Sequence, residues 1–258
     1  MATWKDAVRR VLYPAYEARV VKHLPPDRIP RHVGVMLDGN RRWAKSVGAD
    51  TAHGYRAGAD NIQPLLGWCE EVGVKVVTLW LLSTDNLNRP SAQLTELLGV
   101  IEGAVDSLAS AHRWRLHPVG ALDLLPATTA ERLKAAADST RDIDGLLVNI
   151  AVGYGGRREI ADAVRALLLE QAAEGHTLEQ AAERISAEGI SDHLYTKGQP
   201  DPDLVIRTSG EQRLGGFLLW QSAHSEFYFC EALWPDFRKV DFLRAIRAYA
   251  ERERRFGA

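Results

Sequence analysis

Short apolar runs alternate with longer segments of helical periodicity along most of the chain. The runs predict strands over residues 33–37, 74–82, 114–119, 145–152, 203–208 and 216–221. The segments between them predict helices, for example over 91–110, 157–172 and 239–254, and the Gly- and Pro-containing stretch 189–202 predicts a loop. Alternation of strands and helices is typical of a mostly parallel sheet with helices on both faces. We therefore expect an α/β fold with a central sheet of about six strands.

Three of the predicted strands lead into polar residues suited to binding phosphate. Strand 33–37 is followed at once by Asp38-Gly-Asn-Arg-Arg-Trp43, strand 203–208 contains Arg207, and strand 74–82 runs into Ser83-Thr-Asp-Asn86. The carboxyl ends of parallel strands meet at one edge of a sheet, where free amides at helix starts favour anions. Each segment alone is also explained as a strand-end turn or a helix cap. Together they predict a site for a phosphorylated substrate.

Composition narrows the class of protein. The 258 residues are 46% hydrophobic, enough for one large core, so we expect a single domain. The net charge of −2 argues against an extended nucleic-acid surface, and we expect no nucleic-acid partner. Two isolated cysteines and eight histidines without zinc-like spacing give no metal site of their own. No window approaches the roughly 18 apolar residues of a membrane span, so the predicted location is cytoplasmic.

Residues 1–30 form a distinct N-terminal amphipathic arm. Its apolar residues recur every four positions, with basic residues between them, and Pro14 is expected to kink the helix. The apolar residues are Trp4, Val8, Leu12, Tyr16, Val20 and Leu24. We favour an arm packed on its own domain. The open alternative is a basic segment that makes peripheral contact with anionic membrane.

Ordered sequence blocks cover the chain from about residue 31 to the C-terminus. They are Met36-Leu-Asp-Gly-Asn-Arg-Arg-Trp43-Ala-Lys45, Ser83-Thr-Asp-Asn86, Asn149-Ile-Ala-Val-Gly-Tyr-Gly-Gly-Arg157, Asp203-Leu-Val-Ile-Arg207-Thr, Phe217-Leu-Leu-Trp-Gln221, Glu226-Phe-Tyr-Phe229, Leu233-Trp-Pro-Asp-Phe237 and Arg252-Glu-Arg-Arg-Phe-Gly257. In these blocks the chain resembles the cis-prenyltransferases, also called the undecaprenyl diphosphate synthase family. The resemblance implies a catalytic domain over 31–258 with an apolar tunnel. It also implies a homodimer that uses Mg²⁺ to condense isopentenyl diphosphate with an allylic diphosphate.

The resemblance assigns roles to individual residues. Asp38 matches the catalytic, metal-binding aspartate, and Glu226 matches the second acidic metal ligand. Asn86 matches a residue proposed to help remove a proton, but a neutral amide is a poor base, so we expect released diphosphate to accept that proton while Asn86 orients it. The expected substrate-binding residues are Gly39, Asn40, Arg41, Arg42, Trp43, Tyr55, Ser83, Thr84, Asp85, Leu87, Arg89, Arg207, Arg213, Leu214 and Gly215.

Several positions depart from the family pattern. Where the family often has arginine this chain has Thr51, and where it often has histidine this chain has Tyr55. In the same way, Arg41 stands in place of a glycine, Gly215 in place of a serine and Leu87 in place of a tryptophan. None of these changes removes Asp38. We therefore expect an active enzyme with an altered substrate preference.

Leu81 bears on product length. It falls where long-chain members commonly carry a small residue, and a leucine in a packed wall resists a longer tail by about 1–3 kcal/mol. We expect a fifteen-carbon product, (2Z,6E)-farnesyl diphosphate, from geranyl diphosphate. The alternative for Leu81 is an ordinary core residue, which leaves a medium- or long-chain synthase open.

Other classes fit the sequence less well. Aspartyl-nucleophile phosphatases usually carry a second acid where Asn40 stands, and the Walker and Asp-Asp-x-x-Asp motifs do not occur. The strongest rival is a non-catalytic partner subunit of a cis-prenyltransferase. Retention of Asp38, Arg42 and Glu226 argues against it.

Overall fold

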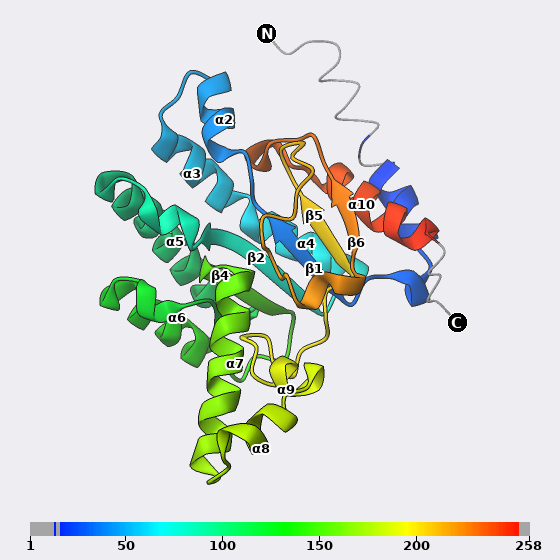
Figure 1. Ribbon diagram of the computed structural model, residues 1–258. Coiled ribbons are helices and arrows are strands. Elements are labelled where there is room, and N and C mark those ends of the chain that lie inside the picture. The colour runs from blue at the N-terminus through cyan, green and yellow to red at the C-terminus, as the bar shows by residue number, and fades with distance from the viewer. Residues whose placement is uncertain (1–12, 14–15, 253–258) are drawn as a thin grey trace.

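Within the described residues, six strands form one sheet in which every pairing is parallel (Figure 1). The structure is a computed structural model that describes Tyr13 and residues 16–252. The order across the sheet is β3-β4-β2-β1-β5-β6. The strands are β1 (His32–Met36), β2 (Val76–Ser83), β3 (Arg115–Val119), β4 (Leu147–Tyr154), β5 (Leu204–Arg207) and β6 (Glu226–Phe229). The expected α/β class with a parallel six-stranded sheet is confirmed.

α-Helices cover the sheet and connect each strand to the next as far as β5 (Figure 1). They are α2 (Asn40–Ser46), α3 (Thr51–Asp60), α4 (Ile62–Val72), α5 (Ser91–Ser110), α6 (Ala127–Thr140), α7 (Gly156–Ala173), α8 (Leu178–Glu183), α9 (Ala187–Ser191) and α10 (Lys239–Glu251). The predicted helix 91–110 matches α5, and 157–172 matches α7 to within one residue at each end. Helix α10 begins at Lys239 as predicted and ends at Glu251, three residues before the predicted end.

The predicted strand 216–221 is wrong. The chain turns there instead, with Gly216 and Leu218 at φ angles of 85° and 46°, which no strand adopts. Phe217 and Leu218 are nevertheless fully buried, so the apolar run reports burial rather than extended structure. The sixth strand is β6, and the short helix η4 (Gln221–His224) precedes it. The predicted loop 189–202 is irregular only after α9 ends at Ser191.

The two faces of the sheet differ in character. One face packs its alternate side chains, such as Val35, Leu79 and Ile206, into the main hydrophobic core with α4, α5, α6 and α10. The other face carries a smaller aromatic cluster around Tyr154 and Phe217. Strands with both faces covered read as continuous apolar runs, which is why the sequence pattern located β1 to β5.

The described part of the N-terminal arm packs against α10. Residues 16–23 are helical, and Val20 and Leu24 are buried in the main core. The Tyr16 hydroxyl accepts a hydrogen bond from Arg247 Nη1 at 3.0 Å. Trp4, Val8, Leu12 and Pro14 lie outside the described residues. Among the residues the structure describes, no helix has the length and apolar character needed to cross a bilayer.

The predicted site lies where the order of strand addition reverses direction in the sheet. From β1 the chain moves to β2 on one side, and only later adds β5 on the other. Ligands of open α/β sheets bind outside the carboxyl ends of the strands at such a switch point. Asp38 follows β1 and Arg207 ends β5, so both lie at this position.

Candidate active site

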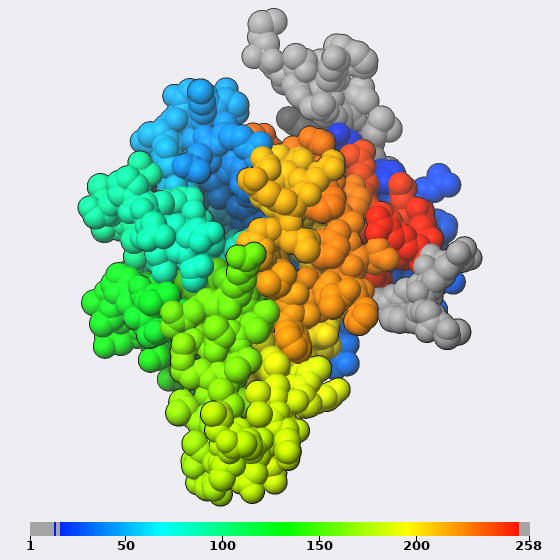
Figure 2. Space-filling model, in the orientation of Figure 1, coloured from blue at the N-terminus to red at the C-terminus, as the bar shows by residue number. Residues whose placement is uncertain are grey.

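A cleft of about 450 Å³ lies at the carboxyl ends of β1, β2 and β5. It opens to the surface as a hollow (Figure 2). Three parts of the chain surround this hollow: the pair of helices α2 and α3, helix α5, and the segment that follows β5. Five arginines and two aspartates line it, which gives the lining a net positive charge suited to diphosphates. The expected site residues in this lining are Asp38, Gly39, Asn40, Arg41, Arg42, Tyr55, Leu81, Ser83, Asp85, Asn86, Arg89, Arg207, Arg213 and Gly215.

The backbone of Asp38 is fixed from neighbouring segments. Its N–H donates to Thr208 Oγ1 at 2.9 Å, while its carbonyl accepts from Thr208 Oγ1 at 2.7 Å and from the Trp234 N–H at 3.0 Å. Gly39 then turns the chain with φ of 110°, where a Cβ would lie 2.9 Å from Leu233. These contacts hold the Asp38 carboxylate at the cleft, where the side chain stays 40% exposed.

Arg207 joins the two sides of the switch point. Its Nη2 lies 2.9 Å from Asp38 Oδ2, and its Nη1 donates to the carbonyl of Arg213. The Arg207 side chain is 7% exposed, and its Nε has no hydrogen-bond partner among the described residues. Glu211 lies 3.9 Å from Arg42 and 3.4 Å from Arg213, which links the start of α2 to the turn after β5.

Arg89 organises the loop that follows β2. Its Nη1 donates to the Tyr55 hydroxyl at 2.7 Å, and its Nε and Nη2 donate to Asn86 Oδ1 at 3.1 and 2.8 Å. The Asn86 N–H in turn donates to Ser83 Oγ at 3.2 Å. The amide oxygen of Asn86 is therefore occupied, and its NH₂ group is the part left to act as a donor.

Trp80 forms a wall of the cleft that the sequence analysis missed. Its ring stacks on the ring of Phe217, with the ring centroids 5.1 Å apart. Gly215 packs against the Trp80 ring, because a Cβ at position 215 would lie 3.4 Å from the nearest ring atoms. The turn that carries Gly215 therefore rests on an aromatic stack. In the sequence Trp80 sits inside an apolar strand, so only the alternation of β2 side chains could have pointed to it. The other unpredicted lining residues are Met36, Leu37, Leu82 and Leu97.

Leu81 lies between the cleft and a second, smaller cavity. That cavity has a volume of about 40 Å³ and is mostly apolar. Five residues line both spaces and so lie between the charged cleft and the apolar interior: Leu37, Asn40, Tyr55, Leu81 and Leu97. The remaining lining of the small cavity comes largely from α3, α5 and Trp234.

Four of the predicted binding residues lie outside the cleft lining. Trp43 stacks on His53 with centroids 5.6 Å apart, and Leu87 packs on the main core. Thr84 donates its N–H to the Tyr154 carbonyl at 3.0 Å, and Leu214 is exposed on the surface.

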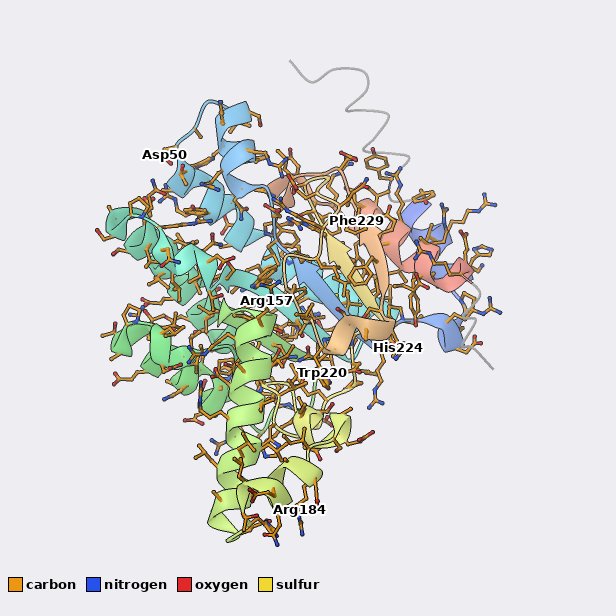
Figure 3. All side chains as sticks on the ribbon, in the orientation of Figure 1. Asp50, Arg157, Arg184, Trp220, His224 and Phe229 are labelled. Atoms are coloured by element: carbon orange, nitrogen blue, oxygen red, sulfur yellow. The ribbon has the colours of Figure 1, made fainter. Side chains whose placement is uncertain are left out.

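Within one chain the structure does not bring Glu226 close to Asp38, so the predicted pair of metal ligands does not form inside a single subunit. Glu226 is in register with Leu204, and Leu204 with Val33, near the amino ends of these strands. Figure 3 shows Phe229 and His224 at opposite ends of β6, and Glu226 lies toward the His224 end. Asp38 lies beyond the other end, roughly 10 Å or more away along the strands. Within one chain the two carboxylates cannot share an ion, and Glu226 instead pairs with Arg252.

Comparison with known proteins decides the family. Residues 36–257 match the Prenyltransf family, which carries the description "Putative undecaprenyl diphosphate synthase". The chain belongs to this family. Its members are prenyl diphosphate synthases, which act on diphosphates. The arginine-rich cleft of this prenyltransferase has the positive charge that binding of such substrates requires.

Relatives of this prenyltransferase match over nearly its whole length. It is 63% identical over 251 residues to a Thermobifida fusca protein named (2Z,6E)-farnesyl diphosphate synthase, covering 97% of this chain and 98% of that protein. It is 58% identical over 253 residues to Isoprenyl transferase 1 of Streptomyces avermitilis, covering 98% of each. A crystal structure of lavandulyl diphosphate synthase from Lavandula x intermedia, in complex with dimethylallyl diphosphate, aligns with a TM-score of 0.84 at 32% identity. The alignment covers 90% of this chain and all of that one.

The donor set of this prenyltransferase suits a magnesium ion that is bound together with substrate. Among the described residues, no three His, Cys, Asp or Glu side chains gather as a metal cage. Asp38 instead offers a partly exposed carboxylate in a cleft rich in arginine. Mg²⁺ is commonly held by one or two carboxylates plus substrate phosphates and water. The residues present therefore fit this ion.

Proposed function

We propose that the chain condenses isopentenyl diphosphate with geranyl diphosphate to form (2Z,6E)-farnesyl diphosphate. The observation that carries this proposal is the placement of Asp38 and five arginines around one cleft, with Leu81 between that cleft and a small apolar cavity. The allylic C1–O bond breaks, C1 bonds to C4 of the isopentenyl unit, and a proton leaves C2 to give the new double bond. The name of the Thermobifida fusca relative supports the same product.

The arginines divide naturally between the two diphosphates. Arg207 and Arg213 are joined at the turn after β5, and we assign them to isopentenyl diphosphate. Arg41 and Arg42 directly follow Asn40, which lines both the cleft and the apolar cavity, and we assign them to the allylic diphosphate. A fixed set of guanidinium donors stabilises the charge that develops on the departing diphosphate.

Asp38 is the residue that would hold Mg²⁺. When bound, this ion supplies positive charge that favours departure of the allylic diphosphate. Asp38 is held by Thr208 and Trp234, so its carboxylate needs little reorganisation to serve this role.

The proton is best accepted by released diphosphate. Asn86 cannot serve as the base, because Arg89 donates two hydrogen bonds to its amide oxygen. Its NH₂ group can donate to a diphosphate oxygen and orient it. Asn86 is thus assigned a positioning role, and Arg89 fixes its orientation.

A homodimer is part of the proposal. Phe229 is 38% exposed on the edge strand β6 and stacks on Phe227, which leaves aromatic surface of the kind enriched at interfaces. Trp234 does not contribute to this surface, because it is fully buried in its own chain. For the N-terminal arm we propose packing on α10 as the main role, with membrane contact as the alternative.

Product analysis of the purified chain tests the function. The chain is incubated alone with Mg²⁺, labelled isopentenyl diphosphate and either geranyl or farnesyl diphosphate, and the products are separated by chromatography. We expect fifteen-carbon product from geranyl diphosphate. Asp38→Ala should reduce the rate by about 10³-fold without unfolding the protein, whereas Asp144→Ala, an exposed acid, should not. Products of fifty carbons or more would overturn the assigned length, and no turnover by the chain alone would favour a partner subunit.

A further inference from the structure

Gly155 and Gly156 join β4 to α7 and lie between two loops of the cleft. Gly155 directly follows Tyr154, the last residue of β4, and Gly156 is the first residue of α7. Arg157 marks this point in Figure 3, at the end of α7 nearest the carboxyl ends of the strands. One loop is the 83–89 segment after β2, and the other is the 213–216 turn after β5.

The 83–89 loop rests on Gly155. The Thr84 N–H donates to the carbonyl of Tyr154 at 3.0 Å. A Cβ on Gly155 would lie 2.6 Å from Thr84 Oγ1, which is closer than a Cβ atom approaches another non-hydrogen atom. Any side chain at position 155 must therefore displace the Thr84 side chain, which belongs to the loop that carries Asn86 and Arg89.

The 213–216 turn rests on Gly156. The Gly156 N–H donates to the Gly216 carbonyl at 2.9 Å. A Cβ on Gly156 would lie 2.6 Å from that carbonyl oxygen and 2.5 Å from Leu219 Cβ. Gly215 and Gly216 have φ angles of 59° and 85°, so the turn has a tightly bent backbone, and this hydrogen bond anchors it to α7.

The first turn of α7 is itself anchored by Glu159. This carboxylate is fully buried and accepts from the Tyr154 hydroxyl at 2.5 Å, from Gln221 Nε2 at 3.0 Å and from the Tyr195 N–H at 3.0 Å. Burial raises the pKa of Glu159, while these hydrogen bonds act in the opposite direction. Gln221 follows the turn in sequence, so both the turn and the segment after it are tied to α7.

We propose that Gly155 and Gly156 are positioning residues that set the relative placement of the two diphosphate-binding loops, with Gly155 serving the 83–89 loop and Gly156 the 213–216 turn. This inference rests on the proposed function. The two glycines are adjacent, yet each contacts a different loop, so an added methyl group at each should have a different kinetic effect. A displacement of about 1 Å in a reacting group can reduce a rate by about 10²-fold.

Steady-state kinetics of Gly155→Ala and Gly156→Ala test the proposal. Gly156→Ala should raise KM for isopentenyl diphosphate about tenfold, with the KM for the allylic substrate changed less than about twofold, because the turn carrying Arg213 moves. Gly155→Ala should instead lower kcat by about tenfold or more, because the loop carrying Asn86 moves. Gly67→Ala is the matched control, since a Cβ there meets nothing within 4 Å.

A rescue experiment separates positioning from general damage. In a Thr84→Ala background the atom that Gly155→Ala would strike is gone, so adding Gly155→Ala should cost little further activity. In a Thr84→Val background a methyl group replaces the hydroxyl, and the full loss should remain. Gly216→Ala moves the same turn from the other side of its hydrogen bond. It should reproduce the raised isopentenyl KM even if Gly156→Ala fails to fold.

Wild-type turnover tests the proposed function, and the variants test this inference. If the wild type shows no turnover, calorimetric titration with isopentenyl diphosphate still reports the effect of Gly156→Ala and Gly216→Ala as weaker binding. Equal losses for both substrates in both glycine variants would overturn the inference, as would failure of Thr84→Ala to rescue Gly155→Ala. Unchanged isopentenyl affinity in both turn variants would also overturn it.

Discussion

Tyr55 stands where the family often has histidine, and the structure gives its hydroxyl a specific partner. That oxygen accepts from Arg89 Nη1 at 2.7 Å, and the same arginine orients Asn86. The Tyr55 ring is buried and lines both the cleft and the apolar cavity. The tyrosine at this position therefore supports the loop that carries Arg89 and Asn86.

Tyr55→Phe should lower kcat/KM about tenfold. The ring still fills its place, so the fold should be kept, but Arg89 loses an acceptor worth about 1.5–3 kcal/mol in a charged hydrogen bond. Stopped-flow or steady-state assays with both substrates measure the loss. Tyr55→His serves as the comparison because it restores the residue usual in the family. Wild-type activity in Tyr55→Phe would contradict the role given to the hydroxyl.

Leu81→Ala should shift the products toward longer chains. The substitution removes the side chain between the cleft and the cavity of about 40 Å³, which enlarges the space open to the growing tail. Each added five-carbon unit gains up to roughly 4 kcal/mol if fully buried, which favours further elongation. Chromatography of the products checks the shift. A folded Leu81→Ala enzyme that still stops at fifteen carbons would place the length limit elsewhere.

At the level of elements, apolar runs located five of the six strands because buried parallel strands are apolar on both faces. The same rule failed at 216–221, where Phe217 and Leu218 are buried by a turn. It also missed β6, a four-residue edge strand that begins with Glu226. A strand this short has too few positions to show a period.

The sequence predicted the position of a site residue where that residue follows or ends a strand. It did not predict the position where this depends on the register in which two strands pair. Asp38 and Arg207 follow from the strand ends alone, since parallel strands bring their carboxyl ends together. The position of Glu226 depends on the pairing of β6 with β5, which the sequence does not reveal. The support of the two loops by Gly155 and Gly156 depends in the same way on contacts between segments far apart in the chain.

A polar ladder crosses the amino half of the sheet and links β1, β2 and β4. The carbonyl of Pro200 accepts from His32 Nδ1 at 2.7 Å, so His32 Nε2 accepts from the Thr78 hydroxyl at 2.8 Å. Asn149 donates to the same hydroxyl at 2.9 Å. Burial lowers the pKa of His32 from 6.5 to about 4, so the ring stays neutral in the folded protein.

Stability should therefore fall as pH drops from about 6.5 toward 4. Over this range the unfolded chain protonates His32 and the folded chain does not, which costs up to roughly 3 kcal/mol of folding free energy. Urea unfolding at a series of pH values measures the slope. His32→Gln should lower stability at pH 7 and flatten the slope between pH 6.5 and 4. An unchanged slope in that variant would assign the pH dependence to other groups.

At the level of the whole molecule, the segment Arg255-Phe256-Gly257 is outside the described residues, and we propose that it serves the active site of the other subunit in the homodimer. Deleting residues 253–258 should then cut activity far more than stability. A mixture of two inactive chains offers a sharper measurement, because one can supply the tail and the other the aspartate.

Full-length Asp38→Ala and the 253–258 deletion should regain activity when refolded together. Half of each mixed dimer then has an intact Asp38 beside a neighbour's complete tail, so up to about a quarter of all sites are restored if subunits pair at random. Sedimentation checks that dimers form. Activity no greater than the sum of the separate chains would rule out a contribution across the interface.

The pairing of Asp38 with Arg207 makes the enzyme's two charged ligands mutually dependent. Before either arrives, the anion-binding group and the cation-binding group neutralise each other at 2.9 Å. A diphosphate that engages Arg207 releases a carboxylate, and a cation that engages Asp38 releases a guanidinium, so by linkage each ligand strengthens the other by one common factor. In Asp38→Asn, Arg207 has no carboxylate to pair with and is already free to bind a diphosphate. In the absence of metal, this inactive variant should therefore bind isopentenyl diphosphate about three- to tenfold more tightly than the wild type, as measured by calorimetry. Weaker binding by Asp38→Asn would show that the pair does not compete with the substrate.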